Sequence, residues 1–192
     1  MTESLRPFYA DWAGYNRRMA EGLGSLGEAD LALIVGADRG DGIEPWPIWA
    51  VAGHTAGTRV FWLCRVFGEP GAETTPFTDP SGMGWEDDLT VTRTAAELVE
   101  AYESTWRVIE GCLDRWTPAT LGESARRMGD AGPQVHTRES VLLRMISHEA
   151  YHLGEINLAL GSNGRTPIDP WPSADWLETA PVAVREGSRQ PS

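Results

Sequence analysis

Two histidines stand one helical turn apart at positions where the surrounding pattern places apolar residues. They belong to the run His148-Glu149-Ala150-Tyr151-His152, inside a segment with helical periodicity from about Arg138 to Leu160. The apolar stripe of this segment reads Val141, Met145, His148, His152, Ile156 and Ala159. Residues four apart share one face of a helix, so both imidazoles are expected to point inward. Any fold of this chain must therefore enclose a pair of polar rings.

A third histidine follows the same rule on another expected helix, from about Pro47 to Phe67, whose stripe reads Ala50, His54, Gly57, Phe61 and Cys64. Burying an unpartnered polar ring costs roughly 1 to 3 kcal/mol. For each ring alone, a hydrogen-bonded core histidine is the simpler interpretation. Together they favour a metal site of His54, His148 and His152, because neutral imidazole is a common ligand of zinc and nickel. The remaining histidine, His136, is expected in solvent.

The periodicity predicts an all-α fold, a four-helix bundle with a long crossover between its second and third helices. No convincing strand alternation is present. The connection from 69 to 92 is long enough to recross helices of about 30 Å, so the second and third helices are expected to run parallel. This connection either covers the site or is a plain crossover. The other two helices are expected from about Leu5 to Leu26, and from a capping box at Thr94 and Glu97 through Trp116.

Length and charge limit the number of domains and the kinds of partner that this chain can have. The 192 residues suit a single domain over 1–185, followed by a disordered tail at 186–192. The net charge is -12, and the 16 basic residues are all arginines scattered along the chain, which argues against nucleic-acid binding. No signal peptide is evident, and the longest apolar tract is interrupted by His54 and Arg59, so we expect a cytoplasmic protein without a membrane span. Cys64 and Cys112 are expected to be reduced core residues.

Read literally, His148-Glu149-x-x-His152 also matches the HExxH motif of zinc peptidases, in which the glutamate is the base for a zinc-bound water. Those enzymes set this helix beside a sheet, which the pattern does not predict here. A metzincin would carry Gly and His where this chain has Glu155 and Leu158. Glu178 lies at a tolerable distance for a gluzincin-type ligand, but in a proline-bounded tail. A metal-dependent hydrolase is therefore the less favoured alternative.

Two runs carry a family resemblance over about residues 5 to 165: Trp46-Pro47-Ile48-Trp49 leading to Gly53-His54 with Trp62 two turns later, and His148 to Asn157, which reads HEAYHLGEIN. With them the chain resembles the DinB-like superfamily, which includes bacterial thiol S-transferases and mycothiol-dependent maleylpyruvate isomerases. The resemblance implies a divalent metal held inside the bundle at the positions of His54, His148 and His152. It implies no DNA binding. It also suggests a homodimer, which the 9 tryptophans favour.

Two departures weaken any transfer of substrate detail. Glu155 stands where many relatives have Gln, and some relatives have an acidic residue near Arg59. The isomerase branch replaces one ligand by Glu, whereas this chain keeps three histidines, so a transferase-like or uncharacterised member is favoured.

Three protein ligands leave a coordination position open for chemistry. The predicted function is a metal-dependent transferase in which a low-molecular-weight thiol loses its proton at zinc or nickel and attacks an electrophile. Glu149 and Tyr151 are the candidate catalytic residues. Glu149 is favoured as a surface charge or a support behind the ligands, and Tyr151 and Glu155 either orient the ligands or, for Tyr151, merely pack. The alternative from another class is a non-catalytic bundle with a structural metal.

Overall fold

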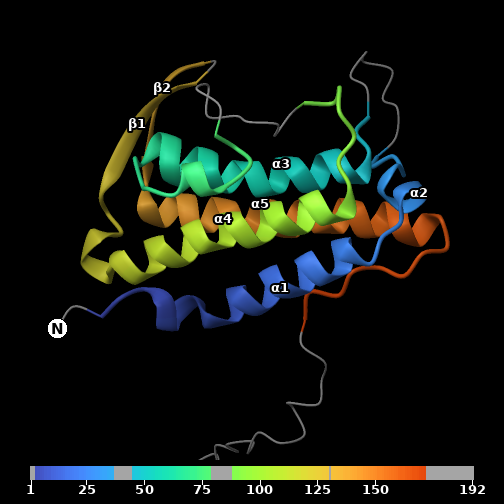
Figure 1. The fold of residues 1–192 in the computed structure, drawn as a ribbon. Helices are drawn as coiled ribbons and strands as arrows, with labels where there is room; N and C mark the ends of the chain where they lie inside the picture. The colour runs from blue at the N-terminus through green and yellow to red at the C-terminus, as the bar shows by residue number, and fades with distance from the viewer. Residues whose placement is uncertain (1–2, 37–44, 79–87, 130, 172–192) are drawn as a thin grey trace, which may run out of the picture.

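Helices make up most of the computed structural model, which describes residues 3–36, 45–78, 88–129 and 131–171. The long helices α1, α3, α4 and α5 lie side by side (Figure 1). Helix α1 packs on α4, and α3 packs on both α4 and α5. The helical elements are η1 (Arg6–Tyr9), α1 (Ala10–Gly24), α2 (Glu28–Leu31), α3 (Ile48–Val60), η2 (Phe61–Val66), η3 (Ala72–Thr74), α4 (Ala95–Arg115), η4 (Pro118–Thr120) and α5 (Arg138–Ser162).

The direction of the helices agrees with the expected crossover. Helices α3 and α4 run in the same direction, while α1 and α5 run the opposite way (Figure 1). The connection between α3 and α4 therefore returns along the length of the molecule. Its residues 79–87, the expected tail at 186–192 and Glu178 lie outside the described residues, so the cover predicted for the site stays a prediction.

Side-chain caps set the first residue of both later helices, and the cap at Thr94 is the one predicted from the sequence. The Thr94 hydroxyl accepts a hydrogen bond from the Glu97 amide, and the Glu97 carboxylate accepts one from the Thr94 amide at 2.8 Å. Thr137 and Ser140 form the same reciprocal pair at the start of α5. Such caps satisfy amides that lack partners in the first turn. The cap at Thr137 therefore fixes where α5 begins, and with it the faces that His148 and His152 occupy.

A buried core runs along the inner faces of these helices. Val141, Met145, Ile156 and Ala159 of the predicted α5 stripe are all buried. Helix α3 is buried on nearly every side, which explains its continuously apolar sequence. It continues without a break into η2, a wider π-helical segment that ends one residue before the predicted end at Phe67. Among the described residues, no helix combines the length and apolar character needed to cross a membrane.

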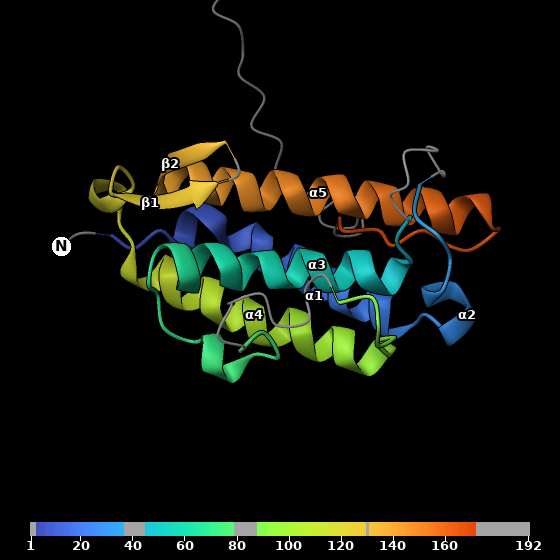
Figure 2. The ribbon, with the colours of Figure 1, turned by 90° about the horizontal axis from the view of Figure 1, so that it is seen from above.

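The sequence predicts no strands, and this prediction is wrong. Strands β1 (Ser124–Gly129) and β2 (Gly132–Thr137) pair antiparallel, with Ala125 opposite His136 and Arg127 opposite Gln134. Burial alternates along both strands, but the less exposed positions are alanine, arginine and glycine on β1 and mostly polar residues on β2, so no apolar alternation marks them. Strand β1 contacts η2, and β2 contacts the start of α5 (Figure 2). The hairpin therefore sits at the end of the molecule where η2 and the first turn of α5 lie.

Candidate metal centre

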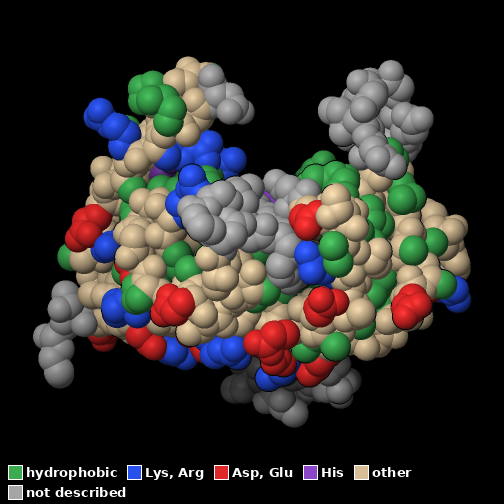
Figure 3. Space-filling model, turned by 45° about the horizontal axis from the view of Figure 1, so that its top comes forward, with side chains coloured by type: hydrophobic (Ala, Val, Ile, Leu, Met, Phe, Trp, Pro, Cys, Tyr) green, Lys and Arg blue, Asp and Glu red, His purple; other side chains and the backbone are tan. Residues whose placement is uncertain are grey.

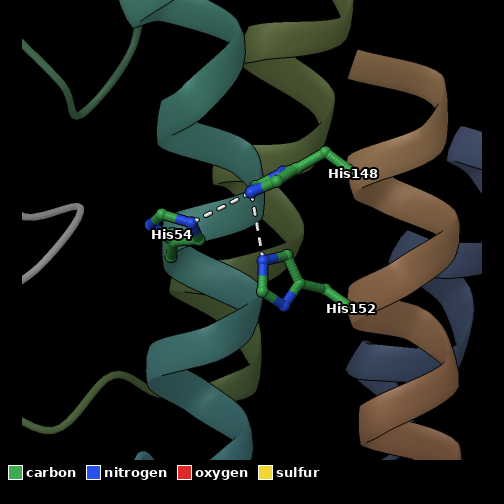
Figure 4. Close-up of side chains that lie close together, drawn as sticks. All are labelled: His54, His148 and His152. Carbon is green, nitrogen blue, oxygen red and sulfur yellow. Dashed lines mark hydrogen bonds between the residues drawn. The ribbon is translucent and has the colours of Figure 1, made fainter. Parts of the chain in front are cut away.

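Three half-buried histidines from two helices lie close together, as the sequence predicts. His54 comes from α3, and His148 and His152 come from successive turns of α5 (Figure 4). The Nε2 atom of His148 lies 3.1 Å from that of His54 and 3.0 Å from that of His152. One nitrogen from each ring lies within 4.8 Å of the others. Two nitrogens that bind one zinc ion at roughly 2.0 to 2.1 Å lie at most about 4.2 Å apart, so small adjustments bring all three within reach.

A carboxylate fixes the orientation of one ring. The Nδ1 atom of His152 donates a hydrogen bond to Oε2 of Glu155 at 2.7 Å. Because a carboxylate accepts and the ring carries one proton when neutral, the proton sits on Nδ1. The lone pair of Nε2 then points at the other two rings. This is how histidine ligands are usually held in metal sites, and it is the contact predicted for Glu155.

The protonation states of the α5 histidines suit a cation. Burial, followed by the neighbouring rings of His152 and His54, lowers the pKa of His148 to about 4. Burial also lowers the pKa of His152, although the bond to Glu155 opposes this. Both rings are therefore neutral at pH 7 and offer lone pairs. An ion between the three rings would accept one lone pair from each neutral imidazole, so the donor set fits a divalent metal.

Aromatic rings border the cluster on two sides. The Trp46 ring lies edge-on to His54, with centroids 5.4 Å apart. Tyr151 lies edge-on to His152 at 5.1 Å, yet 59% of the residue is exposed. Tyr151 thus contacts a predicted ligand from the outer face of α5. Its catalytic role stays a prediction.

Glu149, the glutamate of the HExxH motif, binds other partners. Its Oε1 accepts a hydrogen bond from Nε of Arg59 at 2.8 Å, and its Oε2 accepts one from Nε1 of Trp12 at 2.8 Å. Successive helical residues point about 100° apart, so Glu149 leaves α5 in a different direction from His148. Its carboxylate lines a cavity of about 270 Å³ together with Tyr15, Leu153 and other residues of α1 and α5. This geometry favours the supporting role over that of a base.

Arg59 is the site residue that the sequence reasoning did not assign. Only 1% of it is exposed, although it carries a charge. Besides Glu149, its guanidinium donates to Oδ1 of Asn16 at 2.7 Å, to Oγ1 of Thr105 and to the carbonyl of Tyr102. A charged residue within the longest apolar tract was the signal that could have identified it.

The other reactive side chains lie apart from the histidine cluster. Cys64 and Cys112 are free, as expected, and burial raises the pKa of their thiols to about 11 and about 12. His136 is half-buried on β2 against the Trp62 ring, with centroids 4.7 Å apart. His136 thus lies outside the histidine cluster, as predicted, but it is less exposed than expected because the hairpin folds it onto η2.

Comparison with known proteins agrees with the resemblance in the sequence. The model of the DinB superfamily matches residues 14–156, a span that contains all three clustered histidines. The fold is similar to that in the crystal structure of a DinB-like protein from Bacillus cereus ATCC 10987, with a TM-score of 0.61 and 18% identity over 87% of this chain and 97% of that chain. None of the curated proteins matches this chain. From the extent of the family match, the chain belongs to the DinB superfamily.

Proposed function

We propose that this protein binds a divalent metal through His54, His148 and His152 and uses it as a transferase of a low-molecular-weight thiol. The observation that carries the proposal is the convergence of three imidazoles from α3 and α5, with Nε2 atoms 3.0 and 3.1 Å apart. Imidazole ligands favour zinc or nickel. We further propose that the helices form the four-helix bundle expected of a DinB-like protein.

The number of ligands supports chemistry over a purely structural role. Among the described residues, the group of side chains able to hold an ion consists of these three histidines. Three ligands leave a position for an exogenous group, whereas structural zinc sites are usually closed by four side chains. A bound zinc or nickel ion would supply Lewis acidity that lowers the pKa of a thiol or a water. In that site, Glu155 keeps the proton of His152 on Nδ1, and Trp46 shields His54.

The outer face of α5 supports the proposed homodimer. Leu143 and Leu158 are each 69% exposed, and Tyr151 lies between them on the same face. A protein that keeps large apolar side chains in one exposed row usually covers them with a partner. Light scattering that gives twice 21.0 kDa at micromolar concentration is the expected result. A monomer at that concentration would contradict the dimer without affecting the metal site.

Metal analysis is the first test of the proposed function. Purified protein is expected to hold one zinc or nickel ion per chain, and His152→Ala is expected to lose it. His136→Ala is the matched control, because His136 lies on β2 outside the cluster. Stoichiometric metal in His152→Ala would disprove the assignment of the ligands.

Activity is tested with the loaded protein, a small thiol such as bacillithiol or mycothiol, and a chromogenic electrophile. Conjugation above the uncatalysed rate is expected in the wild type and in His136→Ala, but not in His54→Ala. Cleavage of peptides or esters that depends on Glu149 would instead establish the hydrolase. If neither activity appears and a fourth side chain closes the site, the metal is structural.

A further inference from the structure

Along the two helices that carry the histidines, two further side chains lie toward the hairpin. Arg144 lies one turn before His148 on the same face of α5, and Trp62 follows His54 two turns later along α3 and η2. The guanidinium carbon of Arg144 lies 4.9 Å from the centre of the buried Trp62 ring. Because four residues rise about 6 Å along a helix axis, the backbone of Arg144 lies about that far from the backbone of His148, and its cation packs on Trp62.

The hairpin brings a second cation to the same ring. The guanidinium carbon of Arg127, on β1, lies 5.3 Å from the ring centres of both Trp62 and Phe61. Its Nε donates to Oε1 of Gln134, directly across the hairpin, at 3.1 Å. Two guanidinium groups thus pack on one tryptophan, and like charges held this close repel one another.

Within the described residues, no acid forms an ion pair with either arginine. Arg18, Arg65 and Arg126 form no ion pair there either, so the shared contact with the Trp62 ring is what sets Arg127 and Arg144 apart. Figure 3 shows basic side chains gathered below the hairpin, at the edge of a hollow in the surface.

We propose that Arg127 and Arg144 bind the carboxylate of the small molecule that reaches the histidine cluster. This inference rests on the proposed function, since it assigns an acidic substrate to the same centre. A guanidinium packed on an aromatic ring keeps its in-plane N–H groups free for a carboxylate. One helical turn separates Arg144 from His148, so the acid and the group at the histidines belong to a compact molecule such as a mercapto acid.

Two thiols of equal length, one an acid and one an amide, measure the contribution of the carboxylate to binding. Cobalt-loaded protein is titrated with 3-mercaptopropionate and with 3-mercaptopropionamide, and sulfur-to-cobalt absorption reports binding of each. The acid is expected to bind about tenfold more tightly than the amide, the least effect anticipated for a charge-assisted hydrogen bond. In Arg144→Gln the ratio is expected to fall, and in the double variant Arg127→Gln/Arg144→Gln to approach one.

Arg126→Gln is the matched control. Arg126 neighbours Arg127 on β1 but is exposed and points to the opposite side of the strand. The preference for the acid should survive in this variant, and cobalt content and helical circular dichroism should be equal in all variants. A ratio near one in the wild type, or an equal loss in Arg126→Gln, would overturn the inference.

Failure of the thiol function gives a different result. If cobalt binds but neither thiol produces sulfur absorption, the proposed thiol chemistry is wrong. The acid site is then tested with propionate and propionamide, read from the visible spectrum of cobalt. Tighter binding of propionate that depends on Arg144 would support the carboxylate site by itself. Equal binding of both would overturn it.

Discussion

Glu149→Gln distinguishes a supporting glutamate from a catalytic one. The substitution removes the charge that faces Arg59 while keeping the shape of the side chain. Arg59 is 1% exposed, and the Glu149 side chain is 16% exposed, so the guanidinium gains little solvation in return. We therefore expect the variant to lose stability and to keep its metal.

The magnitude follows from the burial of the pair. Removing one partner of a buried ion pair costs about 3 to 5 kcal/mol. Glutamine still accepts a hydrogen bond from either Trp12 or Arg59, and the site retains some solvent access, so the lower end applies. A loss of about 3 kcal/mol lowers Tm by about 6 to 12 °C in a domain of this size.

Urea unfolding of the metal-free protein measures the effect. Glu103→Gln is the control, because it removes an exposed carboxylate on α4 and should change the free energy of unfolding by less than about 0.5 kcal/mol. Metal content is measured in parallel, and one ion per chain is expected in both variants. An unfolding free energy of Glu149→Gln within about 0.5 kcal/mol of the wild type would refute the role of the pair. Loss of thiol conjugation with unchanged stability would instead identify Glu149 as a catalytic group.

Two further predictions concern pH and packing. The folded state lowers the pKa of His148 from 6.5 to about 4, so the unfolded chain takes up a proton first as the pH falls. Between pH 6.5 and 4, the free energy of unfolding of the metal-free wild type, measured in urea, should therefore fall by up to about 3 kcal/mol more than that of His148→Gln. Parallel plots of unfolding free energy against pH for the two proteins would contradict this. A methyl group added at Gly22 would lie 2.6 Å from Cγ2 of the buried Ile168. Gly22→Ala should therefore lower the free energy of unfolding by about 1 kcal/mol. Gly14→Ala should raise it by about 0.5 to 1 kcal/mol, because the added atom meets nothing within 4 Å. Equal shifts of Tm in the two variants would refute the clash at Gly22.

Helix positions and the histidine cluster were predictable because they depend on periodicity and capping. The stripe through Val141, Met145 and Ile156 gives the inner face of α5, and Thr137 gives its first residue. Once these are known, the face of His148 and His152 is known as well. The inward position of His54 follows from its own stripe. The three rings meet only because α3 packs on α5. Periodicity alone does not predict this packing, and the expectation of it came from the family resemblance.

The hairpin and the buried ion pair were missed because their signals are not apolar patterns. Strand β1 places Arg127 on its inner side, where the aliphatic stem and guanidinium pack on Phe61 and Trp62. Arg59 is buried because Asn16, Thr105 and Glu149 satisfy it from three other helices. Partners this distant in sequence cannot be inferred from the spacing around one residue.

Adjacent residues of α5 contact two different residues of α3. His148 meets His54, and Glu149 meets Arg59 through a buried ion pair. The second contact fixes the rotation and register of α5 against α3, and it does so without a metal. The imidazoles are consequently held close together before any ion binds, which lowers the conformational cost of binding. The HExxH spacing in this chain thus combines two histidines of the cluster with a glutamate that positions their helix, and the contacts of each residue determine its role.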